Sequence, residues 1–376
     1  MKKVFVFAQT FILLFAAVLP SGASAAPDAP QTSAGACVLY EAQSGDFLFA
    51  DNADERLKIA STTKIMTALV VLSKCRTDEV VVIKPEYTGI EGSSMYLKAG
   101  EKLTVMDLLY GLLLPSGNDA AVALACHIAG SVSKFADMMN ETAKSLGCKN
   151  TRFVNPHGLD AQDHYSSARD LAIITAKAMK NNVFCQVAST KTVTVANRVF
   201  TNHNKLLWSI DGMTGGKTGY TKSSGRSLVT CVERGGMKIV CVTLSDPNDW
   251  DDHTALYNWA FSEFKCLSIS GSDLKYMMLP VISGTRDIVG TRPARDYTLL
   301  YTKDDSVSVE VLAPRFVYAG VIRGSRAGTI RVARNGKAVI ELPLVFSESV
   351  PMDEAQRVFR WDKIMLTGRM ANDFWI

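Results

Sequence analysis

Three short polar strings stand in one order along the chain, and their residue types suit nucleophilic chemistry. They are Ser61-Thr-Thr-Lys64, Ser116-Gly-Asn118 and Lys217-Thr218-Gly219. A serine hydroxyl attacks effectively when a neighbouring base takes its proton. A lysine can be that base at neutral pH only if burial or a second cation lowers its pKa. The strings therefore predict a nucleophile with its base, a polar loop and a cationic strand, with Lys217 as candidate second cation.

The first string lies at the start of a predicted helix, residues 59–72, whose apolar residues repeat at helical spacing. Residues three apart on a helix share a face, so Ser61 Oγ and Lys64 Nζ can meet. The free N–H groups and the dipole of the first turn favour negative charge that develops there. Taken alone, the string also fits an N-cap serine followed by an exposed lysine.

The second string interrupts two apolar segments of helical spacing, residues 105–114 and 119–129. A loop held between two packed helices can present the Ser116 hydroxyl as a proton relay to a leaving amine. The Asn118 amide can bind the backbone of a substrate. Taken alone, the string also fits an ordinary turn in which Asn118 or Asp119 caps the second helix.

The third string begins a segment, residues 217–233, that turns at Gly235-Gly236 and returns over residues 237–244, which predicts a β-hairpin. An edge strand that begins Lys217-Thr218-Gly219 offers a cation and a hydroxyl to an anionic substrate terminus. Gly219 lets a substrate backbone lie close to the strand. A plain strand with an exposed lysine is the structural alternative.

With the three strings in this order, the chain resembles the low-molecular-weight penicillin-binding proteins, the serine-type D-alanyl-D-alanine carboxypeptidase family. Residues 91–95, 153–159 and 164–171 also resemble sequence segments of this family, so the resemblance covers nearly the whole chain. It implies an α/β domain of the β-lactamase/transpeptidase type, in which an antiparallel sheet carries a helical subdomain. A small all-β domain is expected to follow.

The resemblance also implies catalytic roles. Ser61 would be acylated, Lys64 would be the general base, and Ser116 would stand beside the scissile bond. The backbone N–H groups of Ser61 and Tyr220 would form the oxyanion hole. The implied reaction removes the terminal D-alanine from peptidoglycan stem peptides, and β-lactams would inhibit it by acylating Ser61. No metal or organic cofactor is implied.

Four further residues would bind substrate by the same resemblance: Asn118, Lys217, Thr218 and Gly219. A β-lactamase would need a carboxylate to activate the deacylating water, and no Glu-x-x-Leu-Asn string of the class A kind occurs. An endopeptidase differs only in the bond it cleaves, and the sequence leaves that alternative open. A non-catalytic wall-binding homologue is disfavoured because all three strings are intact.

The histidines and cysteines predict no further catalytic centre. His157 and His164 lie in or beside a loop that contains proline and glycine, without the acidic spacing of a Ser-His-Asp triad, and are expected to be structural. No H-E-x-x-H or paired C-x-x-C zinc motif occurs. The eight cysteines are scattered singly, so disulfides and buried free thiols both remain open.

The first residues predict export. Lys2 and Lys3, an apolar run over residues 4–19 and Ala23-Ser-Ala25 indicate a signal peptide, residues 1–25, with an uncleaved anchor helix as the alternative. Cleavage removes two lysines, so the formal charge falls from +4 to +2 and nucleic acid is not an expected partner. The expected location is the cell wall or the outer face of the cytoplasmic membrane.

The pattern of elements divides the rest of the chain. Residues 26–268 are expected to form the serine carboxypeptidase domain, and residues 269–348, with short alternating strands and an Asn335-Gly336 turn, the small all-β domain. Residues 349–376 form an amphipathic segment with Val358, Trp361 and Met365 on one stripe. That segment is either a membrane-associating helix or a helix that packs on the β domain.

Overall fold

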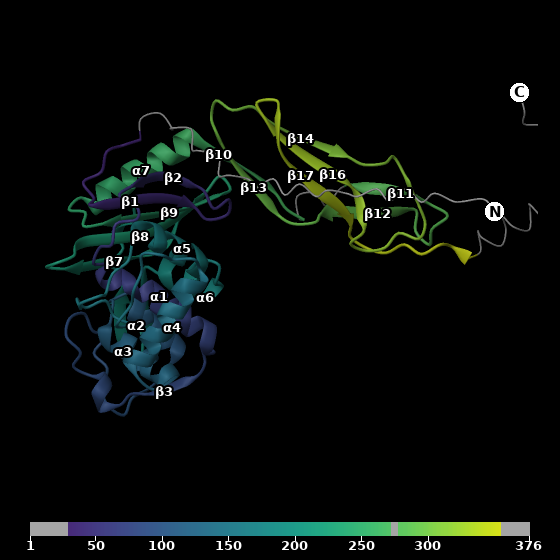
Figure 1. Ribbon diagram of the computed structural model, residues 1–376. Coiled ribbons are helices and arrows are strands. Elements are labelled where there is room, and N and C mark those ends of the chain that lie inside the picture. The colour runs from purple at the N-terminus through teal and green to yellow at the C-terminus, as the bar shows by residue number, and fades with distance from the viewer. Residues whose placement is uncertain (1–28, 272–276, 355–376) are drawn as a thin grey trace, which may run out of the picture.

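The structure is a computed structural model, and it describes residues 29–271 and 277–354 (Figure 1). The expected signal peptide and the apolar stripe through Val358, Trp361 and Met365 lie outside these residues. Among the residues described, no helix combines the length and the apolar character that crossing a bilayer requires.

A five-stranded sheet in the order β2-β1-β9-β8-β7 is antiparallel throughout, as expected. Its strands are β1 (Ala36–Glu41), β2 (Phe47–Asp51), β7 (Met213–Thr221), β8 (Gly225–Arg234) and β9 (Met237–Leu244). The predicted hairpin at Gly235-Gly236 is confirmed as β8–β9. Residues 217–233 are not one strand, however, because a turn at residues 222–224 separates β7 from β8 and leaves β7 at the sheet edge.

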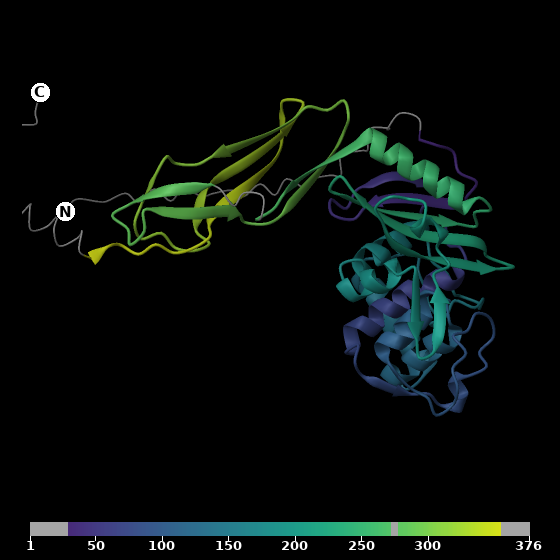
Figure 2. The ribbon, with the colours of Figure 1, turned by 180° about the vertical axis from the view of Figure 1, so that it is seen from behind.

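Helices cover both faces of this sheet, as the two opposite views show (Figures 1 and 2). The helix α7 packs on one face, whereas α5 and α6 pack on the other and lead into the helical region. The helices are α1 (Lys64–Lys74), α2 (Val105–Leu113), α3 (Asn118–Ala129), α4 (Val132–Ser145), α5 (Ala168–Ala178), α6 (Asn182–Ser189) and α7 (Asp249–Glu263). The main apolar core lies among α1 to α6 and the inner sheet face.

Short elements complete the first part of the chain. They are the 3-10 helices η1 (Ala60–Thr63), η2 (Pro85–Tyr87) and η3 (Lys205–Leu207) and the strands β3 (Val80–Val82), β4 (Lys102–Thr104), β5 (Thr192–Val195) and β6 (Arg198–Thr201). The strands form two antiparallel pairs, β3 with β4 and β5 with β6. At the end of β4, Thr104 and Asp107 form a reciprocal capping box that starts α2.

The strands that follow form a separate all-β part with its own apolar core. The strands are β10 (Phe264–Ile269), β11 (Met278–Ile282), β12 (Ile288–Pro293), β13 (Tyr297–Thr302), β14 (Val307–Leu312), β15 (Val317–Tyr318), β16 (Arg326–Arg334) and β17 (Lys337–Phe346). Six of them form a sheet in the order β14-β16-β17-β12-β11-β15, while β10 pairs with β13. Asn335 and Gly336 both take positive φ between β16 and β17, as a two-residue hairpin turn requires.

The strand β10 connects the two cores. Phe264 at its start belongs to the cluster that α7 forms with the outer sheet face, and Ile269 at its end belongs to the core of the all-β part. The transition between the two parts therefore falls within β10.

Asp119, at the start of α3, holds the preceding loop in place. Its buried carboxylate accepts hydrogen bonds from the backbone N–H groups of Met95 and Leu97, at 3.0 Å each, and from the Ser94 hydroxyl at 2.6 Å. An ionised acceptor at a helix N-terminus is also favoured by the helix dipole. The loop over residues 93–97 is thus fixed to the helix that begins with Asn118.

We expect Asp119→Ala to lower the free energy of unfolding by about 3 kcal/mol, because the buried N–H groups of Met95 and Leu97 lose their acceptor. Urea unfolding followed by circular dichroism measures the change. Asp137→Ala, on the exposed face of α4, is the matched control and should change stability by about 0.5 kcal/mol at most. Equal effects of the two variants would contradict this account.

Candidate active site

Ser61 lies in η1, directly before α1, rather than in the first turn of an α-helix. The 3-10 turn still brings its side chain to Lys64, whose Nζ lies 2.9 Å from Ser61 Oγ. The preceding residue, Ala60, takes a φ of +44°, which is uncommon for a residue with a Cβ. The predicted pair of hydroxyl and amine is therefore formed, through a tighter and locally strained turn.

Lys64 is fully buried, and its Nζ faces three oxygen atoms. Besides Ser61 Oγ, they are Asn118 Oδ1 at 2.7 Å and the carbonyl oxygen of His157 at 2.6 Å. Burial, and then the positive charge of Lys217, hold the pKa of Lys64 well below its usual value. A neutral amine can donate to the amide and carbonyl oxygens and turn its lone pair to the Ser61 hydroxyl. Lys64 is thus arranged to accept the Ser61 proton.

Asn118 begins α3, and the predicted interruption between two helices is confirmed at residues 114–117. Its backbone N–H donates to the carbonyl oxygen of Ser93 and its Nδ2 donates to that of Glu91. These bonds fix the amide so that Oδ1 faces Lys64. Asn118 therefore orients the base in this structure.

Ser116 has the strongest local signs of a functional residue. Its backbone takes a φ of +65°, and its side chain is buried. Among the described residues, its Oγ has no hydrogen-bond partner. A strained residue with an unpaired buried hydroxyl costs stability, and such residues cluster at active sites.

The edge strand β7 presents Lys217, Thr218 and Gly219 beside Ser61. Lys217 is buried, its Nζ donates to the carbonyl oxygen of Thr218 at 2.9 Å, and burial lowers its pKa to about 7. Gly219 is needed for the close approach, because a Cβ there would stand 3.1 Å from the backbone nitrogen of Ser61. The third string, on β7, thus lies beside Ser61, whereas Lys64 approaches Ser61 from α1.

A cleft of about 310 Å³ opens over these residues. Five of the predicted site residues line it: Ser61, Ser116, Thr218, Gly219 and Tyr220. The buried Lys64 and Lys217 and the amide of Asn118 lie behind its wall. The structure therefore brings all the predicted site residues together around one opening.

Sequence reasoning missed part of the cleft wall, which includes Ser93, His203, Arg226, Asp249 and Trp250. Arg226 Nη2 lies 2.6 Å from Asp249 Oδ1, and its guanidinium lies over the Trp250 ring at 5.6 Å from the centroid. Arg226 lies in β8, whereas Asp249 and Trp250 begin α7, so these three residues meet only in the folded chain. Their pairing holds the guanidinium at the rim of the cleft.

His157 was expected to be structural, and its backbone carbonyl contributes to the site. Gly158 has a φ of +90°, and a Cβ there would stand 1.9 Å from the carbonyl oxygen of Ala60. This close contact puts the His157 carbonyl against Lys64. Burial lowers the pKa of both His157 and His164 to about 4, so both are neutral at pH 7.

The chain is similar to known proteins of one family. The family model for D-alanyl-D-alanine carboxypeptidase matches residues 23–248. The chain is 35% identical to D-alanyl-D-alanine carboxypeptidase DacC of Escherichia coli, over 95% of this chain and 94% of that protein. It is 30% identical to D-alanyl-D-alanine carboxypeptidase DacF of Bacillus subtilis, over 83% and 85% of the two chains.

A solved structure shares the fold over both parts of the chain. The crystal structure of penicillin-binding protein 5 from Haemophilus influenzae superposes with a TM-score of 0.69 and 31% identity, over 86% of this chain and 98% of that one. The fold implied by the sequence is confirmed by this likeness and by the antiparallel sheet. The family match, the relatives and the shared fold show that the chain belongs to the D-alanyl-D-alanine carboxypeptidase family.

Proposed function

We propose that this protein is a serine-type D-alanyl-D-alanine carboxypeptidase that removes the terminal D-alanine from peptidoglycan stem peptides. The observation that carries the proposal is the buried Lys64 Nζ, 2.9 Å from Ser61 Oγ, with Lys217 lowering its pKa. Membership of the family supports the same activity. The substrate ends in a free carboxylate, which gives the cationic edge strand an anion to bind.

In acylation, Lys64 takes the Ser61 proton as Oγ attacks the carbonyl carbon of the penultimate D-alanine. The backbone N–H groups of Ser61 and Tyr220 stabilise the oxyanion that forms. Ser116 relays the proton that Lys64 accepted to the leaving amine, which leaves Lys64 neutral again, and free D-alanine departs. Water then hydrolyses the acyl-enzyme with Lys64 as general base, which restores the Ser61 hydroxyl.

Substrate binding falls to the edge strand and to Asn118. Lys217 and Thr218 bind the terminal carboxylate, Gly219 lets the peptide lie against β7, and the Asn118 amide contacts the peptide backbone. β-Lactams carry a reactive amide beside a carboxylate. They enter the same site, acylate Ser61 and leave slowly.

The substrate places the enzyme outside the cytoplasmic membrane, in the cell wall or at the outer membrane face. Export by the signal peptide of residues 1–25 would bring it there, and residues 349–376 would associate with the membrane or pack on the all-β part. The proposed division of the chain is residues 26–268 for the catalytic domain and residues 269–348 for the all-β domain. The second domain carries none of the proposed site residues, so its role is to space or dock the first.

Ser61→Ala should lower the rate of D-alanine release from a diacyl-Lys-D-Ala-D-Ala peptide by at least about 10³-fold, because no other group forms the acyl-enzyme. It should also abolish labelling by a fluorescent penicillin. Ser73→Ala, on the exposed side of α1, is the matched control and should keep both activities. Intact mass spectrometry detects the acyl-enzyme.

Two results would contradict the proposal in different ways. A stable penicillin adduct without D-alanine release in the unaltered protein would mean a working nucleophile with another acceptor or another cleaved bond. If the unaltered protein gave no penicillin adduct and released no D-alanine, the result would favour a wall-binding protein without turnover. Rapid hydrolysis of the penicillin would instead indicate a β-lactamase.

Ser116→Ala should separate activity from stability. The Ser116 hydroxyl has no hydrogen-bond partner among the described residues, so its removal leaves no group unpaired. We expect the unfolding temperature to stay the same or rise, while the rate of D-alanine release falls by about 10²- to 10⁴-fold. A loss of stability together with activity would assign Ser116 a structural role.

The pH dependence should report both lysines. Lys64 must be neutral to act as base, so kcat/KM rises as the pH passes its lowered pKa. Lys217 must be charged to bind the carboxylate, so kcat/KM falls as the pH rises through about 7, the Lys217 pKa in the free enzyme. In Lys217→Arg the guanidinium stays protonated, and the alkaline limb should move to higher pH. An unchanged alkaline limb would exclude Lys217 as its source.

A further inference from the structure

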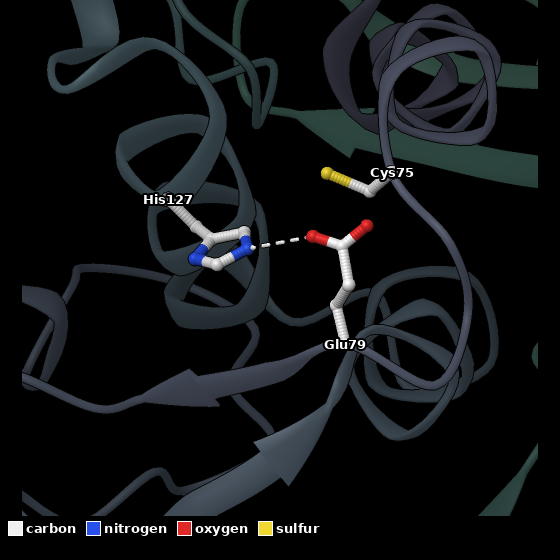
Figure 3. Close-up of side chains that lie close together, drawn as sticks. All are labelled: Cys75, Glu79 and His127. Atoms are coloured by element: carbon white, nitrogen blue, oxygen red, sulfur yellow. Dashed lines mark ion pairs between the residues drawn. The ribbon is translucent and has the colours of Figure 1, made fainter.

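A second cluster of reactive side chains lies at the opposite end of α1 from Lys64. Cys75 is the C-cap of α1, Glu79 precedes β3, and His127 lies in the last turn of α3. Figure 3 shows the three side chains pointing toward one another. Since α1 has 11 residues, the cluster is about 15 Å from the catalytic lysine along the helix axis. The proposed reaction does not use it.

The spacing of the three donor atoms suits a small metal ion. The thiol sulfur, one imidazole nitrogen and one carboxylate oxygen all lie within 4.8 Å of one another. His127 Nε2 and Glu79 Oε2 are 3.6 Å apart, which is too long for a good hydrogen bond. Two ligands of a tetrahedral zinc ion, each bound at about 2.1 Å, lie about 3.4 Å apart. A shift of a few tenths of an ångström would bring the His127 and Glu79 donor atoms to that separation.

The backbone around Glu79 already holds the carboxylate in this orientation. Glu79 Oε1 accepts a hydrogen bond from the backbone N–H of Arg76 at 2.6 Å, which leaves Oε2 toward His127. The Glu79 carbonyl oxygen accepts from the backbone N–H of Val105, at the start of α2. Cys75 is fixed by its own N–H, which donates to the carbonyl oxygen of Val71. Because these groups are already held in place, little conformational entropy would be lost when an ion binds.

We propose that Cys75, Glu79 and His127 form a zinc-binding site that is separate from the active site. Sulfur, nitrogen and carboxylate oxygen together select Zn²⁺ over Mg²⁺ or Ca²⁺, which prefer oxygen ligands alone. Binding replaces the thiol proton of Cys75 by the metal, releases that proton to water, and leaves the fourth position to a water molecule. The ion would tie the end of α1, the segment before β3 and the end of α3 together.

The test uses the full mature protein, freed of metal by chelation under reducing conditions. Isothermal titration with ZnCl₂ should give one site per chain in the unaltered protein. Cys75→Ser, Glu79→Gln and His127→Asn should each weaken the affinity by about tenfold or more, because each removes one of three coordinate bonds. Cys266→Ser changes another partly exposed thiol, in β10, and should bind zinc as the unaltered protein does.

Cobalt supplies a second readout. Co²⁺ at this site should give a thiolate-to-metal charge-transfer band that Cys75→Ser abolishes and Cys266→Ser retains. Zinc should also raise the unfolding temperature of the unaltered protein but not that of Cys75→Ser. Absence of stoichiometric binding, or equal affinity in all the variants, would overturn the proposal. D-alanine release by each variant shows that the fold is intact, and the outcome for zinc is independent of that activity.

Discussion

Two buried lysines in one site impose the constraint on which the rest of the structure depends. Burial removes both Lys64 and Lys217 from solvent and lowers the pKa of each, and the positive charge of Lys217 lowers the pKa of Lys64 further. Their hydrogen-bond partners are amide, hydroxyl and carbonyl oxygens, which stabilise an amine without supplying a full negative charge. A substrate that brings its own carboxylate supplies the missing charge. The same electrostatics that free Lys64 to act as a base thus select an anionic ligand.

Holding this pair requires segments from distant parts of the chain. The Lys64 amine meets Asn118 from the start of α3 and the His157 carbonyl from a later loop, while Lys217 arrives on β7. Glycine allows two of these approaches, because a Cβ on Gly158 or Gly219 would collide with or crowd the backbone around Ser61. Asp119 fixes the loop that in turn orients Asn118. The helical core therefore holds Lys64 and its hydrogen-bond partners in position.

The sequence predicts the features that depend on local patterning. The three strings, the hairpin at Gly235-Gly236 and the interruption before Asn118 are visible in spacing and turn residues, and the structure has them. Three features depend on tertiary contacts that periodicity does not encode: the 3-10 turn at Ser61, the His157 carbonyl beside Lys64 and the Arg226–Asp249 pair. The cluster of Cys75, Glu79 and His127 was not predicted for the same reason, since its last two members are 48 positions apart in the sequence. A zinc motif can be recognised in a sequence only when its ligand residues lie close together along the chain.

The five-stranded sheet ends in an exposed edge at β7. An unpaired edge strand normally invites association with other chains, and proteins protect it with charge or with irregular backbone. Within residues 29–271 and 277–354, no strand pairs with the outer side of β7, and Tyr220 is 67% exposed. Lys217 lies on that strand, and Gly215 and Gly216 take positive φ within it, which restricts regular pairing. An edge that is open yet irregular suits a short peptide held at its charged end better than a second β-strand of another protein.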